Sequence, residues 1–345
     1  MLYVGIDFHK EYSYITEMDQ NGVVSKDFRL SNDKETLTRF VNELPGDAKV
    51  ALEATCNWYY FYDLIEGRDV DVSLAHPLKT KAIASAKIMN DKISSATLAH
   101  LLRSDLLPRA YIPDRATRDA REILRQRAFL VAMRTRLKNR VHAILSKNGI
   151  CCPYSDVFGK KSLRWLGALP LRPCYQQAMQ SYIRLAAVFA SEIALVTETI
   201  TSLSLDSPQA RLLDTHPGIS HYSALLIDTE IGTIDRFPSD GQLCSYGGLV
   251  PTVHASGGKT RRGHITKQGS KWLRWILIEC SPHAVEASPH YENLYNRVLY
   301  KHGKGAAKTA VARAMLKTIY YMLKRNQPFQ ERPILKRAPA SAMGS

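Results

Sequence analysis

The amino-acid sequence predicts a mixed α/β domain at the N-terminus, followed by a mostly helical remainder. Two patterns carry this prediction. Short apolar runs alternate with helix-like segments over residues 1–110, and longer segments with helical periodicity then take over. The chain has 345 residues, which is enough for two or more domains that each have a hydrophobic core.

The N-terminal domain is expected to hold five strands. They cover residues 2–6, 12–17, 23–30, 50–53 and 70–75. Asp33 lies in a helix N-cap sequence after the third strand, and an aromatic helix at 58–62 separates the fourth strand from the fifth. Three strands, a helix, a strand, a helix and a strand follow the order of the RNase-H-like fold.

Three carboxylates stand at the ends of predicted elements in this domain. Asp7 closes the first strand, Glu53 closes the fourth, and Asp91 opens a later helix. Carboxylates brought together from separate elements form a site for a hard cation, since Mg²⁺ prefers oxygen ligands. The alternative is that Asp7 is a turn residue and Glu53 a surface acid.

The charge balance favours a polyanionic partner. There are 47 Lys and Arg residues against 32 Asp and Glu, a formal net charge of +15. Nucleic acid is the expected partner, and an anionic membrane surface is the alternative. No apolar run reaches the ~18 residues that a membrane-spanning helix needs, so we expect a cytoplasmic protein. Six cysteines without C-x-x-C spacing argue against a zinc site and for reduced thiols.

Two long helices are expected at residues 115–147 and 176–203, with apolar stripes typical of a coiled coil. Each stripe needs a partner, either the other helix or a second subunit, so we expect a homo-oligomer, either a dimer or a tetramer. The first helix has ten Lys and Arg against two acids. We therefore expect nucleic-acid contacts, rather than a merely solvated face, from Arg118, Arg121, Arg125, Arg136 and Arg140.

A third region begins near residue 207. Residues 212–227 have the pattern of a helix-hairpin-helix, in which the turn at Gly218 would offer backbone N–H groups to a phosphate. An ordinary corner between two helices is the alternative.

Ser256 precedes two glycines inside a strongly basic stretch. Between Lys259 and Arg274 there are six Lys and Arg and no acid. The serine is a candidate nucleophile, with the basic residues holding a phosphate beside it. The alternative is a flexible basic loop that only binds phosphate. The expected phosphate-binding side chains are Lys259, Arg261, Arg262 and Lys267.

A set of short motifs, in order over residues 2–330, resembles one family. They are Tyr3-Val4-Gly5-Ile6-Asp7, Leu52-Glu53-Ala54-Thr55, Asn90-Asp91-Lys92-Ile93, Pro217-Gly218-Ile219, Tyr246-Gly247-Gly248-Leu249-Val250-Pro251, Ser256-Gly257 and Arg262-Gly263-His264. The sequence is similar to insertion-sequence transposases with a RuvC-like DEDD domain and a catalytic serine. These are bridge-RNA-guided recombinases related to the Piv DNA invertase.

The resemblance implies a serine recombinase that cuts and rejoins donor and target DNA under the direction of a guide (bridge) RNA. It implies that Asp7, Glu53 and Asp91 bind Mg²⁺ and that Ser256 attacks DNA. The expected domains are a RuvC-like domain over residues 1–110, a helical coiled-coil region over 111–206, a transposase domain over 207–330 and a flexible tail over 331–345.

One position departs from the family pattern. A fourth acid is expected three residues after Asp91, and Ser94 stands there. Either three carboxylates suffice in this chain, or its cleavage activity is attenuated or lost.

Two other functions are compatible with the same residues. A RuvC-like metal-dependent nuclease or junction resolvase would activate water and form no covalent intermediate. A non-catalytic nucleic-acid-binding protein would carry the acids as structural residues.

Overall fold

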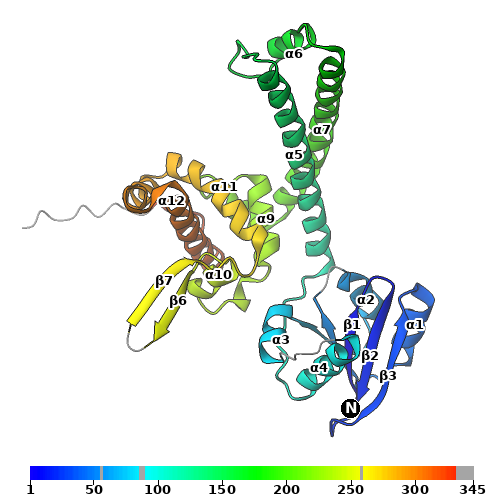
Figure 1. Ribbon diagram of the computed structural model, residues 1–345. Helices are drawn as coiled ribbons and strands as arrows, with labels where there is room; N and C mark the ends of the chain where they lie inside the picture. Colours follow the sequence, from blue (N-terminus) through cyan, green and yellow to red (C-terminus); the bar gives the residue numbers. More distant parts are fainter. Residues whose placement is uncertain (55–56, 85–89, 257–258, 332–345) are drawn as a thin grey trace, which may run out of the picture. The chain divides into compact units, whose positions relative to one another are not determined.

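The computed structural model describes residues 1–54, 57–84, 90–256 and 259–331, without the side chains of residues 254–260 and Arg262 (Figure 1). The chain divides into two compact units, Met1–Ile112 and Pro113–Ser345. The boundaries expected from the sequence lay after residues 110, 206 and 330. We describe each unit separately.

Unit 1 is built on a five-stranded mixed sheet, which confirms the predicted α/β domain. The strands are β1 (Tyr3–Phe8), β2 (Tyr12–Met18), β3 (Val24–Ser31), β4 (Lys49–Glu53) and β5 (Asp71–Ala75). Their order across the sheet is β3-β2-β1-β4-β5. β1 pairs antiparallel with β2 and parallel with β4, so it lies in the centre. This arrangement is consistent with a RuvC-like domain.

Helices cover both faces of this sheet. They are α1 (Lys34–Glu43), α2 (Trp58–Ile65), α3 (Pro77–Ile83) and α4 (Asp91–Arg103). Val4 and Ile6 belong to the core that includes residues of α1 and α2. Side chains alternate between faces along a strand, so Gly5 and Asp7 belong to the opposite face, where α4 packs. In β4, Ala51 contributes to the core with α4, and Glu53 follows it on the same face.

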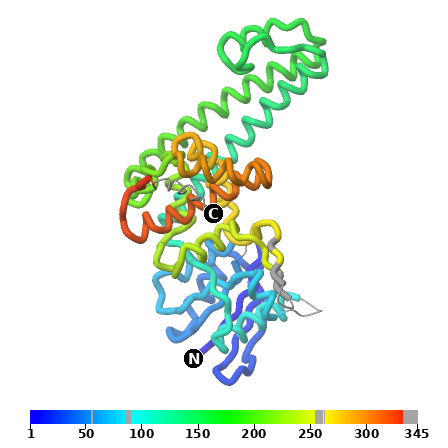
Figure 2. Tube along the Cα trace, turned by 90° about the vertical axis from the view of Figure 1, so that its left-hand side faces the viewer, coloured from blue at the N-terminus to red at the C-terminus, as the bar shows by residue number. Residues whose placement is uncertain are grey.

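Unit 2 is mostly helical, as predicted. Its first part is a hairpin of two long helices, α5 (Arg115–Lys147) and α7 (Pro173–Asp206), with α6 (Lys160–Gly167) at its far end. α5 and α7 lie side by side in both views (Figures 1 and 2). Of the two possible partners, the structure therefore pairs these helices with each other. Some apolar side chains on the hairpin stay exposed: Phe129, Leu185, Val188 and Leu195.

The rest of unit 2 has a hydrophobic core to which α9 contributes Ala224, Leu225, Leu226, Ile227 and Ile231. The elements are α8 (Pro208–Asp214), α9 (His221–Ile231), η1 (Ile234–Arg236), α10 (Asp240–Tyr246), β6 (Pro251–Ser256), β7 (Lys259–Ile265), α11 (Lys271–Ala287) and α12 (Pro289–Arg325). α12 is broken at Gly303, with φ 81° and ψ 174°. None of the helices in the described ranges is long and apolar enough to cross a membrane.

The turn between α8 and α9 explains why residue 218 is a glycine. Gly218 has φ +80°, and a Cβ there would lie 2.5 Å from the backbone nitrogen of Ala284 in α11. The turn is thus held by close backbone packing against α11. A phosphate contact at Gly218 stays a prediction.

Candidate metal centre

The carboxylate of Asp91 is brought to Asp7 by an unusually close contact between helix and strand. α4 begins at Asp91, and the side chain of Asn90 caps it by accepting a hydrogen bond from the Ile93 nitrogen at 2.8 Å. A Cβ at Gly5 would overlap the Ser95 carbonyl oxygen and lie 2.6 Å from the Ala99 nitrogen. The glycine therefore allows the first turns of α4 to rest directly on β1.

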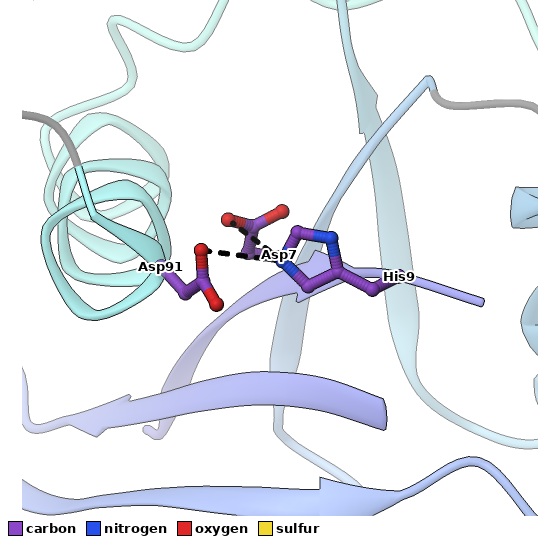
Figure 3. Close-up of side chains that lie close together, drawn as sticks. All are labelled: Asp7, His9 and Asp91. Atoms are coloured by element: carbon purple, nitrogen blue, oxygen red, sulfur yellow. Dashed lines mark ion pairs between the residues drawn. The ribbon is translucent and has the colours of Figure 1, made fainter. Parts of the chain in front are cut away.

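Three side chains converge at this place (Figure 3). Asp7, His9 and Asp91 each offer one ligand atom, and these atoms all lie within 4.8 Å of one another. His9 Nε2 is 3.6 Å from Asp7 Oδ2 and 3.4 Å from Asp91 Oδ1. Tyr12 donates a hydrogen bond from its hydroxyl to Asp91 Oδ2 at 2.8 Å, which fixes that carboxylate from the other side.

The carboxylates of this cluster lack full charge compensation. Burial raises the pKa of Asp7; His9 opposes this shift, Asp91 adds to it, and a hydrogen bond from Ser94 opposes it. The pKa of Glu53 is raised by burial and then by Asp7, and lowered by His9. Among the described residues, His9 is the only basic side chain within ion-pair distance of Asp7 or Asp91.

These residues fit a divalent cation. Buried carboxylates with raised pKa values are stabilised when a positive charge enters between them, and oxygen donors suit a hard ion. Glu53 lies close enough to Asp7 for their charges to interact, but its carboxylate is outside the closest group of three. The structure thus brings Asp7 and Asp91 together, while the Glu53 carboxylate lies outside this closest group.

Ser94 occupies the position where the family pattern expects a fourth acid. It lies one turn after Asp91 in α4, and its hydroxyl donates a hydrogen bond to Asp7. The residue at this position therefore lies beside Asp7, but it brings no negative charge.

Sequence reasoning missed His9. A signal for it was available: His9 stands two residues after Asp7, directly beyond the end of β1, and residues two apart in extended chain point to the same side. His9 and Asp91 are far apart in the sequence, so no local pattern indicated that they would lie close together in the folded protein.

The predicted nucleophile lies in a two-stranded hairpin. Ser256 is the last residue of β6 and pairs with Lys259 of β7. The side chains of Ser256, Lys259 and Arg262 lie outside the described part of the structure. Arg261 and Lys267 are exposed.

Two of the five arginines expected to contact nucleic acid are buried inside unit 2. Arg118 is 5% exposed and Arg121 is 8% exposed. Arg121 donates to the Thr229 carbonyl from Nε at 3.0 Å and from Nη2 at 2.6 Å. Buried side chains do not belong to an exposed basic face, and a nucleic-acid contact by Arg118 and Arg121 stays a prediction.

Arg125 is also engaged within the unit. It pairs with Glu230 at 3.3 Å and keeps about a third of its side chain exposed. Arg136 and Arg140, further along α5, are exposed. Nucleic-acid contact therefore stays a prediction for the outer part of the helix.

Comparison with known proteins gives matches to both units. Residues 4–149 match the family DEDD_Tnp_IS110, described as "Transposase". Residues 210–296 match Transposase_20, described as "Transposase IS116/IS110/IS902 family".

Curated proteins with related sequences include three of particular interest. The chain is 26% identical to "Putative transposase y4qE" of Sinorhizobium fredii, over 81% of this chain and 70% of that protein. It is 25% identical to "Transposase for insertion sequence element IS1328" of Yersinia enterocolitica, over 81% of this chain and 82% of the relative. A shorter match, 31% identical over 36% of this chain and 39% of the relative, is to "Pilin gene-inverting protein" of Moraxella bovis.

Proposed function

Because the chain belongs to the IS110/IS116 family of transposases, we propose that it recombines DNA by cutting and rejoining strands through a serine–phosphate intermediate. The observation that carries the proposal is the convergence of Asp7, His9 and Asp91 at the buried end of β1. A transposase domain of the DEDD type typically depends on a divalent metal, and we propose Mg²⁺ or a similar ion at this cluster.

In the proposed reaction the two units have different tasks. Asp7, Glu53 and Asp91 would hold the cation, which when bound would supply positive charge to polarise a DNA phosphate. The Ser256 hydroxyl attacks phosphorus, so that a serine–phosphate bond forms and a phosphate–sugar bond breaks. The serine proton ends on the departing sugar oxygen. The phosphodiester energy is conserved, so the reverse attack by a sugar hydroxyl can rejoin strands.

We propose further that a guide RNA selects the donor and target DNA by base pairing, while the protein binds the nucleic-acid backbone and recognises its shape. The net charge of +15 supports binding to nucleic acid. The exposed Arg136, Arg140, Arg261 and Lys267 are available for phosphate contacts.

A homo-oligomer, either a dimer or a tetramer, is part of the same proposal. It is supported by the apolar side chains that the α5–α7 hairpin leaves exposed.

A nuclease or junction resolvase without a covalent intermediate is the second candidate. It is favoured by one observation: Asp7, His9 and Asp91, the three members of the cluster found among the described residues, all belong to unit 1. In that reaction water, and not Ser256, would attack the phosphate.

Covalent trapping separates the two candidates. The full chain is incubated with end-labelled DNA of the element's two ends, RNA transcribed from the flanking non-coding DNA, and Mg²⁺ or Mn²⁺. The test is run in the Ser94→Asp background, because that variant is expected to cleave faster. We expect a labelled protein–DNA adduct and strand exchange from Ser94→Asp itself, neither when Ser256→Ala is added, and both when Ser191→Ala is added, which changes an exposed serine of α7. Cleavage by Ser94→Asp without an adduct would favour the nuclease, and an adduct in the presence of Ser256→Ala would reject this nucleophile.

Ser94 leads to a further expectation about rate. Because a serine brings no charge to the cluster, we expect slow or absent cleavage by this chain and faster cleavage by Ser94→Asp in Mg²⁺. Strand cleavage measured over time checks this. If the serine form already recombines at full rate and the aspartate form is no faster, the placement of the metal at this cluster is wrong.

A further inference from the structure

We propose that His9 is a direct ligand of the divalent cation and that its imidazole shifts the site's preference from Mg²⁺ toward first-row transition ions such as Mn²⁺. The inference rests on the metal dependence in the proposed function and goes beyond the acids that the family pattern supplies. It assigns the role to a residue of the turn after β1.

The first support is that His9 Nε2 has no hydrogen-bond partner among the described residues. This nitrogen is buried as an atom, although about 38% of the side chain is exposed. It lies 3.4 Å from Asp91 Oδ1 and 3.6 Å from Asp7 Oδ2, and it hydrogen-bonds to neither. A buried polar atom without a partner is costly, so a ligand at this position would stabilise it.

The second support is the spacing of the three donor atoms. Donors bound at about 2.1 Å to one octahedral ion lie about 3.0 Å apart when adjacent and about 4.2 Å apart when opposite. The separations here are 3.4 and 3.6 Å, and no pair exceeds 4.8 Å. These distances are longer than good hydrogen bonds but close to those between ligands of one cation.

The third support is that the chain holds His9 in place. The His9 backbone nitrogen donates a hydrogen bond to the Tyr12 carbonyl at 3.0 Å, and the Asn32 side-chain amide donates one to the His9 carbonyl at 2.8 Å. The imidazole packs on the Tyr12 ring, with the ring centroids 4.8 Å apart. The hydroxyl of the same tyrosine fixes Asp91, so one residue positions two of the donors.

The consequence for metal choice follows from the donor set. The cluster has Asp7, Asp91 and a nitrogen from His9, with serine at the fourth position of the family pattern. Mg²⁺ favours oxygen donors, whereas imidazole raises the affinity for transition ions. Replacing an acid by a nitrogen therefore weakens Mg²⁺ binding more than Mn²⁺ binding.

The test uses Mn²⁺ bound to the full chain, without DNA or RNA. Pulsed electron paramagnetic resonance detects a nitrogen coordinated to Mn²⁺ by its ¹⁴N coupling. We expect this coupling in the wild type, a change to the ¹⁵N pattern when the protein is labelled with ¹⁵N-histidine, and loss of the coupling in His9→Gln. His100→Gln, which changes an exposed histidine of α4, should keep it.

Titration calorimetry gives the second readout. Mn²⁺ affinity should fall at least about tenfold in His9→Gln, because even groups that only orient a ligand are worth about 10–100-fold. Mg²⁺ affinity should fall less. If His9→Gln does not fold, His9→Asn and the ¹⁵N-labelled wild type carry the same test.

The outcomes separate this inference from the proposed function. A wild type that binds Mn²⁺ without nitrogen coupling, or a His9→Gln protein that keeps the coupling, overturns the role of His9 and leaves the recombinase proposal intact. A wild type that binds neither ion overturns the metal premise of both. The covalent trapping of Ser256 tests the nucleophile separately from the identity of the metal ligands.

Discussion

Asp7 in unit 1 and Glu230 in unit 2 are both buried acids, but they differ in how far neighbouring groups compensate their negative charge. Glu230 has a side chain only 5% exposed; it pairs with Arg125 at 3.3 Å, lies 3.7 Å from Arg121 and accepts a 2.8 Å hydrogen bond from Ser270. Asp7 has a side chain 10% exposed and lies beside another acid, with only His9 as a basic neighbour within the described residues.

This is the difference expected between a structural charge and a charge at the proposed metal site. A buried carboxylate is costly unless positive groups and hydrogen bonds compensate it. Unit 2 supplies them for Glu230 from α5 and from the N-cap of α11, and thereby joins three helices. Unit 1 leaves its carboxylates partly uncompensated, which is expected where a cation from solution has to bind.

The largest effect on stability is expected from removing Glu230. In Glu230→Ala the buried Arg121 loses its acidic partner, and breaking such a pair costs about 3–5 kcal/mol of unfolding free energy. Denaturant unfolding measures the loss, with Glu122→Ala, an exposed acid of α5, as the control expected to change little. Equal stability of both variants would mean that the Glu230 network does not hold α5 to α9.

Adding one methyl group at Gly5 tests how the acids of unit 1 are brought together. Gly5→Ala should push α4 away from β1, at a cost of about 1–3 kcal/mol, and weaken Mn²⁺ binding because Asp91 moves with the helix. Gly46→Ala is the control, since a Cβ there would meet nothing closer than 3.7 Å. Unfolding and metal titration are measured on both. Unchanged metal affinity in Gly5→Ala would contradict the link between this contact and the site.

A smaller effect is expected from the arginines of α5 that are not used inside unit 2. Replacing Arg136 and Arg140 with Gln should lower nucleic-acid affinity by about tenfold and reduce the slope of log affinity against log salt by about two. The control replaces the same two arginines with lysine, which keeps the positive charge and should leave the slope unchanged. An unchanged slope in the glutamine variant would place the nucleic-acid contact elsewhere.

The smallest effect is a gain in stability from removing the charge of Asp7. The raised pKa of Asp7 means that the folded protein binds this proton more tightly than the unfolded chain does. The resulting loss of stability is absent below the ordinary pKa of 3.8 and grows as the pH rises through the raised value. With a chelator present, Asp7→Asn should therefore melt higher at pH 7, on the order of a few degrees, and the gain should vanish in acid.

The metal dependence of this melting temperature provides the control. Mn²⁺ should stabilise the wild type and not Asp7→Asn, because binding to the folded state alone raises its stability. If Asp7→Asn melts lower than the wild type at pH 7, the negative charge of Asp7 stabilises the folded protein, and the expectation of an uncompensated charge is wrong.

The order of elements in unit 1 could be predicted from local sequence patterns. A continuous apolar run marked β1, and alternating apolar residues marked β2 and β3. Asp33 caps α1 by accepting a hydrogen bond from the Thr36 nitrogen. The acids at the ends of β1 and β4 and at the start of α4 were found for the same reason. Local periodicity, capping residues and strand ends depend on neighbours a few residues away, so the sequence contains them directly.

The pairing of charged groups was decided only by the tertiary structure. The basic stripe of α5 gave no sign that Arg121 would turn inward to Thr229, which lies 108 residues away in the chain. Nor did the sequence alone show that His9 would meet Asp91, or that Tyr12 would bind the same acid from 79 residues away. A charge is exposed or compensated according to which elements pack against it, and that depends on contacts between distant parts of the chain.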